Sequence, residues 1–517
     1  MIDKKFALTM LSVAFLGLAG CNGDDGATGP AGVAGAPGAD GTDGADGVDG
    51  TDGVDGASLQ IVVDRVYSEA NDFRGLTYAQ VGDQAGKIYV SGFVGTDDAS
   101  RMAVVGRLFA DGTPDTSFGG DGFVEVQATV EQSSSDEQSI GVAELQSGDV
   151  VFAVNAAEST GGRSIFLFRV TPDGALATGW GDADGKAEVV FGYADADNAS
   201  FPGDAVEDFV WDVQVDRSVA TDRVVVFGNG SANDGTRTDT DRYITRVNIT
   251  DTGIETDVTF NGGEAFSFDA GGLGLGDNQR RGIVEADGKI VAAGYTNLGD
   301  SPRHHVMTIR LNEDGSFDET FGGYSDEPNL VAATPGLTVF NPFQIDGGFA
   351  EAYAVGYQEI TDSYVEAGYG GATGSGFESS FGFQSYVAQD MVAFRTSAGL
   401  ADSQDLTFGD GVSGAVVIQS EGKGFPSSED RGRHLVVLPD GRTVVVGRYG
   451  GVPAAFVLTI DGQPDTGVFG DGVIELSNPA VSSQFFGAAL SPDGTRVAMS
   501  TNYNENGARL VVIKPGN

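Results

Sequence analysis

The sequence predicts an all-β body built as a closed ring of seven four-stranded units, and three observations lead to this prediction. Glycine makes up 80 of the 517 residues, which indicates many tight turns between short strands. No long stretch shows the 3.6-residue apolar spacing of an amphipathic helix. One turn motif recurs along the body, most often at spacings of 61 or 62 residues, and such a period is typical of repeat architectures.

The turn motif is clearest in three segments. They read LFADGTPDTSFGGDGFVEV (108–126), LNEDGSFDETFGG (311–323) and LTIDGQPDTGVFGDGVIEL (458–476). In each, a strand ends in Asp-Gly, because glycine tolerates the positive φ of a tight turn. An aromatic residue follows, which we expect to be buried as an anchor. The predicted anchors are Phe118, Trp180, Phe260, Phe321, Phe408 and Phe469.

A second element, a short β-rich run, precedes the motif and occurs seven times. The seven runs begin at Ala85, Ser147, Thr221, Asp287, Thr361, Asp440 and Asp493. With a further strand upstream of each run, the pattern is four strands per unit, which predicts a seven-bladed β-propeller. The units resemble the family of roughly 60-residue bacterial repeats with a DG…D…FG.DG core, assigned to β-propellers of exported proteins. The resemblance covers about Leu59 to Asn517 and weakens in the second, third and fifth units.

The last unit has only three strands after Phe485, and the N-terminal end of the body supplies the fourth. The segment LQIVVDRVYSE (59–69) aligns with GVIELSN (472–478), the last strand of the sixth unit. We therefore expect residues 59–69 to complete the seventh blade by pairing with residues 508–514, with Ile61 and Val63 on the buried face. Such pairing closes the ring and protects sheet edges.

The first 21 residues have the layout of an export signal. Lys4 and Lys5 precede an apolar run at 6–17, which is too short to span a bilayer, and Leu-Ala-Gly-Cys follows at 18–21. This resembles the lipobox of bacterial lipoproteins. The resemblance implies that residues 1–20 are a signal peptide and that Cys21 is acylated, with palmitate as a chain. With Asn22 next, it implies a lipid-anchored protein of the cell envelope, at the outer membrane if the cell is Gram-negative. An ordinary cleaved signal peptide with an incidental cysteine is the alternative.

Residues 21–58 follow as a spacer with glycine at every third position. Twelve Gly-X-Y triplets run from Gly23 to Gly56, which resembles the collagen-like segments of bacterial surface proteins. Only two prolines occur, and six aspartates at the Y position would repel one another in a triple helix. A disordered acidic tether and a homotrimeric stalk therefore both remain open.

Composition limits the partners of the mature protein. With 75 acidic and 29 basic residues, the net charge is −46. Nucleic acid binding requires clustered lysine and arginine, so we expect no nucleic acid partner. Cys21 is the single cysteine, so no disulfide can form within the chain and the body must rely on its core.

The sequence contains few residues or motifs that indicate catalysis or metal binding. His304 and His305 are adjacent and should face opposite sides of a strand, and His434 opens an apolar strand, so structural roles are predicted for all three. No nucleophile elbow, zinc motif or phosphate loop is present. Acidic turns at 180–185 and 193–204 offer oxygen ligands for Ca²⁺, the second with Asp195, Asp197, Asn198 and Asp204. Neither has the full pattern of a calcium loop, so we predict no cofactor and keep Ca²⁺ as an alternative. The glycine-rich and aromatic segment 368–386 is either a recognition loop or a long hairpin.

Two function classes remain. The first is a surface-tethered binding or scaffold lipoprotein that presents the propeller, residues 59–517, to an unidentified protein or glycan. The second is an exported propeller enzyme of the lyase or glycosidase type with its site in the central channel. Convergence of histidine, tyrosine, arginine and glutamate at one mouth of the channel would favour the enzyme, whereas fold alone cannot decide.

Overall fold

The computed structural model describes the β-propeller body and leaves out the N-terminal region and several connections. The described residues are 59–95, 101–128, 138–182, 184–191, 208–231, 240–270, 275–298, 304–343, 349–371, 390–400, 404–409, 411, 414–418, 420, 430–476, 483–502 and 507–515, except 158–162. Cys21, the spacer, the predicted calcium loop 193–204 and most of the segment 368–386 lie outside this set. The chain divides into two units, Met1–Gly53 and Val54–Asn517.

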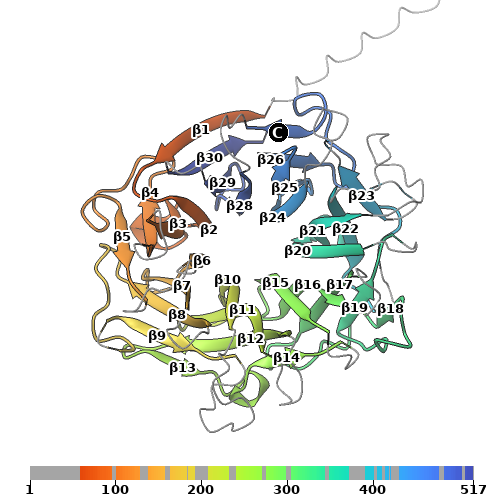
Figure 1. Cartoon of the computed structure of the whole chain (residues 1–517), viewed down its shortest axis with the longest axis horizontal. Helices are drawn as coiled ribbons and strands as arrows, with labels where there is room; N and C mark the ends of the chain where they lie inside the picture. Colours follow the sequence, from red (N-terminus) through yellow and green to blue (C-terminus); the bar gives the residue numbers. More distant parts are fainter. Residues whose placement is uncertain are drawn as a thin grey trace, which may run out of the picture. The chain divides into compact units, whose positions relative to one another are not determined.

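Seven sheets, antiparallel except for one short strand pair in blade 4, form the blades of a propeller, as predicted (Figure 1). Blade 1 contains β2 (Asp72–Tyr78), β3 (Ile88–Val94), β4 (Met102–Leu108) and β5 (Phe123–Val126). Blade 2 contains β6 (Gln138–Glu144), β7 (Val150–Ala157), β8 (Arg163–Val170) and β9 (Lys186–Val189). Blade 3 contains β10 (Phe209–Val215), β11 (Arg223–Ser231), β12 (Thr240–Ile249), β13 (Ile254–Thr256) and β14 (Phe266–Phe268).

Blade 4 contains β15 (Asp277–Val284), β16 (Ile290–Asn297), β17 (His304–Leu311), β18 (Tyr324–Ser325) and β19 (Leu337–Phe340). Blade 5 contains β20 (Phe349–Gln358), β21 (Ser363–Gly371), β22 (Asp390–Ser397) and β23 (Ala415–Ile418). Blade 6 contains β24 (Arg431–Val437), β25 (Thr443–Tyr449), β26 (Val452–Leu458) and β27 (Val473–Glu475). Blade 7 contains β28 (Phe485–Leu490), β29 (Val497–Asn502), β30 (Ala508–Lys514) and, from the other end, β1 (Gln60–Tyr67). Short 3-10 turns lie at Gly82–Gln84, Asn261–Gly263 and Glu359–Thr361.

Blades 3 and 4 depart from the predicted four strands because each has an extra short strand at its outer edge. In blade 3, β13 and β14 both pair with β12, at opposite ends of that strand. In blade 4, β18 runs parallel to β19 outside it. The seven predicted β-rich runs correspond to the second strands of the seven blades, β3, β7, β11, β16, β21, β25 and β29.

Closure by the N-terminal strand is confirmed. β1 pairs with β30, with Tyr67 opposite Ala508 and Gln60 opposite Lys514. The expectation that Ile61 faces the core is wrong, because the register shifts between Ile61 and Val63. This irregularity breaks the two-residue alternation of the strand. Val63 and Tyr67 are therefore buried, at 8% and 2% exposure, whereas Ile61 is 42% exposed.

The core lies between the blades rather than inside one of them. Leu59, for example, packs in a cluster with residues of blades 6 and 7, whereas Val63 and Tyr67 pack in the next cluster, which joins blades 7 and 1. Each sheet covers its neighbour around the ring, so the first and last sheets must also meet. The closing strand supplies apolar side chains to both of these junctions.

The repeated turn motif is held by an arginine, an aspartate and a phenylalanine, which we call the Arg–Asp–Phe clamp. In blade 4, Arg310 Nε donates to Asp318 Oδ2 over 2.7 Å and the guanidinium lies 5.0 Å from the centre of the Phe321 ring. Asp318 Oδ1 accepts from the backbone N–H of Thr320. Equivalent clamps are Arg107–Asp115–Phe118, Arg246–Asp257–Phe260 and Arg395–Asp405–Phe408.

Five of the six predicted anchors are buried, but Phe469 is not. Phe118, Trp180, Phe260, Phe321 and Phe408 are at most 2% exposed. Phe469 is 63% exposed and Val468 is buried in its place. The anchor is the third residue after the clamp aspartate, and counting from Asp465 gives Val468. Phe469 then occupies the following position, where it takes a φ of +49°; glycine takes this conformation in blades 1, 2, 4 and 5, and Asn261 takes it in blade 3.

Candidate functional site

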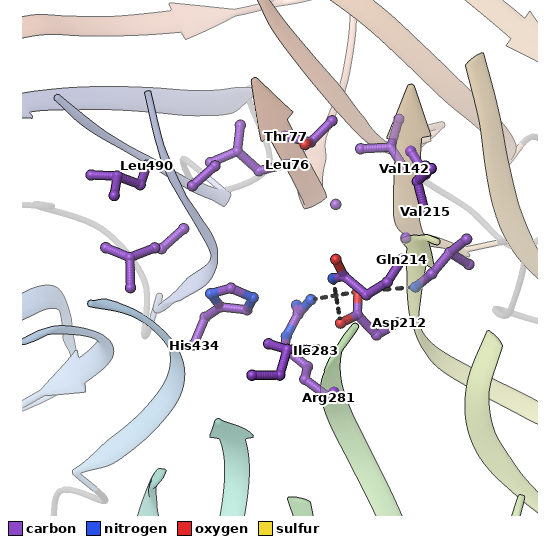
Figure 2. A pocket seen from close by; sticks show the side chains of 18 of the residues that line it. Leu76, Thr77, Val142, Asp212, Gln214, Val215, Arg281, Ile283, His434 and Leu490 are labelled. Atoms are coloured by element: carbon purple, nitrogen blue, oxygen red, sulfur yellow. Dashed lines mark hydrogen bonds and ion pairs between the residues drawn. The ribbon is translucent and has the colours of Figure 1, made fainter. Parts of the chain in front are cut away.

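The inner strands of the seven blades surround the axis of the ring (Figure 1), and two cavities between them form a central channel. In its wider part is a cavity of about 370 Å³, lined by residues from every inner strand, including Leu76, Val142, Val215, Ile283 and Leu490 (Figure 2). This end lies toward the carboxyl ends of the inner strands. Aliphatic side chains make up half of its lining, which also includes the ionisable side chains Tyr78, Glu144, Asp212, Arg217, Arg281, Tyr357 and His434.

Arg281 crosses the channel and separates the wider part from its other end. The residue stands on β15, and its Nη2 donates to the backbone carbonyls of Phe486 (2.9 Å) and Arg74 (3.4 Å). These carbonyls belong to β28 and β2, which lie on the opposite side of the ring. Arg281 Nη1 is 3.5 Å from Asp212 Oδ1, and Asp212 also accepts from Gln214 (Figure 2). Burial raises the pKa of Asp212, an effect that the charge of Arg281 opposes.

His434 stands in the channel wall close to Arg281 (Figure 2). Burial in the narrow channel, together with the positive charge of Arg281, lowers the pKa of His434 well below its usual value. The imidazole is therefore neutral at physiological pH. The predicted structural role of His434 fits a side chain that fills the wall, because its positive form would meet a fixed arginine.

A second cavity of about 230 Å³ lies beyond Arg281, toward the amino ends of the inner strands. We call it the arginine mouth. It is lined by Arg74, Ile140, Trp211, Arg280, Arg281, Tyr353, Arg433, Gln484 and Phe486. Four of these nine residues are arginines and none is acidic, although the whole chain has 29 basic and 75 acidic residues. The arginine mouth is thus a local reversal of the charge of the protein.

Arg280 is the most buried cation of the arginine mouth, with 7% of its surface exposed. Its guanidinium lies 4.1 Å from the centre of the Trp211 ring and 4.7 Å from that of Tyr353. Nη2 donates to the hydroxyls of Tyr295 (2.9 Å) and Tyr353 (3.4 Å). Within the described part of the chain, Arg280 Nε has no hydrogen-bond acceptor and no carboxylate forms an ion pair with this arginine.

Arg433 stands on β24 and faces the same tyrosine. Its guanidinium is 4.7 Å from the centre of the Tyr353 ring, and its Nε donates to Gln484 Oε1 over 2.8 Å. Burial lowers the pKa of Arg433, and the positive charges of Arg431 and Arg280 lower it further. The arginine mouth therefore holds like charges close together in partly desolvated surroundings.

Behind Arg280 lies a cluster of aromatic and ionisable side chains. His304 Nδ1 and Glu351 Oε1 are 2.5 Å apart, and the His304 ring is stacked on Tyr295 with 4.9 Å between centroids. Burial opposes ionisation of Glu351, but the hydrogen bond and the charge of His304 hold its pKa below the usual value. Tyr353 connects this cluster to the cavity. The convergence of histidine, tyrosine, arginine and glutamate at one mouth, which would favour an enzyme, is therefore met in part, because only Arg280 and Tyr353 of this cluster line the cavity.

The histidines otherwise occupy the places that the sequence predicts. His304 and His305 begin β17 and face opposite sides of it, since His305 Nε2 approaches Asp326 at 3.6 Å rather than Glu351. The two rings do not share a ligand position. Sequence reasoning missed the link between His304 and Glu351, because blades 4 and 5 bring them together over 47 positions of sequence.

The predicted calcium turn at 180–185 is described except for position 183. Asp182 Oδ1 accepts from the backbone N–H groups of Asp184 (2.8 Å) and Lys186 (3.3 Å), and its Oδ2 is 3.7 Å from Lys186 Nζ. This carboxylate therefore accepts hydrogen bonds from the turn backbone and lies beside a lysine.

The structure contains a further acidic cluster that the sequence analysis did not predict. The carboxylates of Asp241, Asp269 and Asp277 approach within 4.8 Å of one another. Asp277 accepts from the backbone N–H of Ala270 over 2.6 Å, as Asp430 does from that of Ser420 over 2.7 Å. Aspartate at the start of an inner strand thus anchors the preceding connection in both blades, so the structure provides a role for Asp277 without a metal. Burial raises its pKa to about 7.

The arginines are the functional residues that sequence reasoning missed. A partial signal was an Arg-Gly pair in three inner strands, at 74–75, 281–282 and 431–432. It marks Arg74 and Arg281 of the cavity, but not Arg280 or Arg433. In each of the three pairs the ladder register shifts next to the glycine. Because these strands are far apart in the chain, only ring closure shows that their arginines meet.

Two family descriptions match parts of the chain. A collagen triple helix repeat matches residues 15–60, and a β-propeller domain of unknown function, DUF5122, matches residues 86–118 and 285–321. The propeller matches cover the second strand and the clamp turn of blades 1 and 4. No curated protein sequence matches the chain. No helix among the described residues is long and apolar enough to cross a membrane.

Solved propellers have low similarity to the chain. An alpha-L-arabinofuranosidase of Fusarium graminearum is 10% identical over 72% of this chain and 92% of its own, with a TM-score of 0.37. The soluble aldose sugar dehydrogenase of Escherichia coli is 11% identical over 72% and 95%, with a TM-score of 0.38. PorZ, a bacterial surface component of the type-IX secretion system of Porphyromonas gingivalis, is 14% identical over 86% and 46%, with a TM-score of 0.36. Together with the family matches, the structure identifies a β-propeller protein with a collagen-like segment before it.

Proposed function

We propose that the protein is a surface-tethered binding module whose ligand enters the channel at the arginine mouth. The main support for this proposal is the local reversal of charge: four arginines and no carboxylate line this cavity, whereas the whole chain has a net charge of −46. Burying these arginines beside aromatic rings costs desolvation energy, because not all of them have a carboxylate partner. A role in ligand binding accounts for their presence despite this cost. A concave site with convergent polar groups is the usual form of a ligand site.

The tether is the second part of the proposal. The lipobox-like sequence supports a lipid anchor at Cys21, and the Gly-X-Y spacer at 21–58 supports presentation of the propeller at a distance from the membrane. Replacing Cys21 with serine should release the protein from the membrane fraction, because no other anchor is apparent in its sequence. Fractionation of labelled cells measures this, and a variant that is processed normally yet still sediments with membranes would contradict the lipid anchor.

The binding site has its own test. Envelope extract should be retained by the immobilised mature chain and lost with the double variant Arg280→Gln/Arg433→Gln. Arg442→Gln is a matched control, since Arg442 lies beyond the other end of β24 and pairs with Asp440 and Asp465. Retention that is the same for all three proteins would mean that the arginine mouth is not the binding site.

An enzyme of the lyase or glycosidase type is the second candidate, favoured by the cluster of His304, Glu351, Tyr353 and Arg280. Binding fits better for two reasons. Glycoside hydrolysis normally uses two carboxyl groups flanking the scissile bond, and the lining of the arginine mouth has none, since Glu144 and Asp212 line the other cavity of the channel. Among the histidine, glutamate and tyrosines of the cluster, only Tyr353 borders the cavity. Incubation with acidic and neutral oligosaccharides, followed by chromatography of the products, separates the candidates, because chain shortening would establish the enzyme.

A further inference from the structure

We infer that the arginine mouth recognises the carboxylate of an acidic sugar, a uronate residue of a polysaccharide. This inference rests on the proposed function, since it names the ligand class of the same cavity. It follows from three properties of the cavity: the unpaired positive charge, the excess of hydrogen-bond donors over free acceptors, and the size.

The first property, positive charge without a carboxylate partner, favours an anionic ligand. Several buried arginines elsewhere in the body have carboxylate partners, as in the Arg310–Asp318 and Arg223–Asp216 pairs, whereas the buried Arg242 is satisfied by Gln279 Oε1 and backbone carbonyls. In the arginine mouth, Arg74 pairs with Asp72 and Arg281 with Asp212, but Arg280 and Arg433 have no carboxylate partner within the described residues. Glu351 lies behind Arg280 and its charge favours the positive form of this arginine, but the two groups form no ion pair. A bound anion between Arg280 and Arg433 would add a direct counter-ion on the cavity side.

The hydrogen-bonding groups indicate an oxygen-rich ligand rather than a peptide. Arg280 Nε and Trp211 Nε1 are donors that have no acceptor in the described part of the chain. The one amide oxygen of the lining, Gln484 Oε1, already accepts from Arg433. A sugar acid offers carboxylate, ring and hydroxyl oxygens as acceptors, whereas a peptide would bring N–H groups that find few acceptors here.

Geometry and size narrow the ligand further. A guanidinium presents a planar set of donors that matches a carboxylate with two parallel hydrogen bonds. The rings of Trp211, Tyr353 and Phe486 hold the arginines in place from the side, with Arg74 4.8 Å from the centre of the Phe486 ring. The cavity of about 230 Å³ is below the range of roughly 300–1,000 Å³ usual for drug-sized ligands. One sugar residue therefore fits, and Arg281 blocks deeper entry.

Titration calorimetry of the mature chain carrying Cys21→Ser tests the inference directly. The probes are galacturonate and glucuronate oligomers, their neutral counterparts made of galactose and glucose, and a glutamate oligomer as an acidic peptide. We expect both uronate oligomers to bind at least tenfold more tightly than the neutral sugars and the peptide. Tighter binding of the peptide would assign the cavity to a protein partner, and equal binding of neutral and acidic sugars would remove the carboxylate from the recognition.

The variants Arg433→Gln and Arg433→Lys add a readout that a merely structural role would not produce. Since Arg280 and Arg433 repel each other, we expect Arg433→Gln to keep or raise the melting temperature while uronate affinity falls at least tenfold. Arg433→Lys retains the charge but not the planar donors and should recover only part of the affinity. Arg442→Gln should leave uronate affinity unchanged.

Failure of the inference and failure of the proposed function are distinguishable. In one outcome, uronate oligomers do not bind but retention of envelope extract still depends on Arg280 and Arg433. This result would overturn the acidic-sugar assignment and leave the binding site in place. Uronate affinity that is unaffected by Arg433→Gln would place the sugar site elsewhere on the protein. Extract retention that is independent of both arginines would overturn the proposed function itself.

Discussion

Removal of the closing strand β1 should destabilise the propeller far more than removal of the spacer. The two proteins to compare begin at Ser58 and at Asn71. The first retains the whole strand, whereas the second loses Leu59, Val63 and Tyr67, which are 8%, 8% and 2% exposed. It also loses Ala70, whose carbonyl accepts from the Ala508 N–H over 2.7 Å.

The magnitude follows from burial. Each of the three large side chains contributes about 1.5–3 kcal/mol, which gives roughly 5–9 kcal/mol in total. The hydrogen bond from the Tyr67 hydroxyl to the Gly112 carbonyl, 2.6 Å long, adds about 1 kcal/mol. The ion pair of Asp64 with Arg509 adds less than about 1 kcal/mol, since Asp64 is 43% exposed. The sum is comparable to the net stability of a typical domain, about 5–15 kcal/mol.

Thermal unfolding followed by circular dichroism measures the effect. We expect the protein starting at Asn71 to melt at least about 10 °C below the one starting at Ser58, or to fail to fold. Equal melting temperatures would refute the role of β1 in closing the ring. Val63→Asn and Ile61→Asn provide a finer test, because the shifted register predicts a clear loss of stability for the first and almost none for the second. A larger loss for Ile61→Asn would refute the register.

Three further outcomes are expected. Asp318→Asn should lower the free energy of unfolding by about 3–5 kcal/mol in denaturant titration, because it leaves the buried Arg310 without its carboxylate partner. The control Asp287→Asn should lower it by less than about 1 kcal/mol, because Asp287, which pairs with Lys289, is 60% exposed. Burial raises the pKa of Glu366 to about 8, so the folded form keeps a proton that the unfolded chain has lost, and stability should fall from about pH 4.5 to pH 8. Glu366→Gln should make this slope shallower without abolishing it, because burial also raises the pKa of Asp277 to about 7; a variant with the same pH profile as the parent would contradict this. Ultracentrifugation should show any trimer of the mature chain only at high salt or with Ca²⁺, because the spacer aspartates repel one another, and a monomer under every condition would leave only the tether.

Much of the fold could be predicted because the repeat is local. Each Asp-Gly turn and β-rich run carries its own strand pattern, and the count of seven runs gave the number of blades. Errors arose where one residue changed a register. The Phe-Gly pattern predicts Phe469 as an anchor, but the distance from Asp465 decides burial, and Val468 takes that place. Ile61 was assigned to the core by alternation, which the irregular pairing of β1 interrupts.

The sequence by itself determined the all-β class, the closure of the ring by its N-terminal strand and the Gly-X-Y spacer, since each depends on short-range periodicity or on matching ends of one repeat. Only the tertiary structure decided the candidate site. Arg74, Arg280 and Arg433 stand in blades 1, 4 and 6 and meet because the ring directs the amino ends of all inner strands to one mouth. No local pattern records such a meeting, because it depends on how seven sheets close around an axis. The positive charge of the arginine mouth is therefore a property of the closed ring, which the strongly acidic composition conceals.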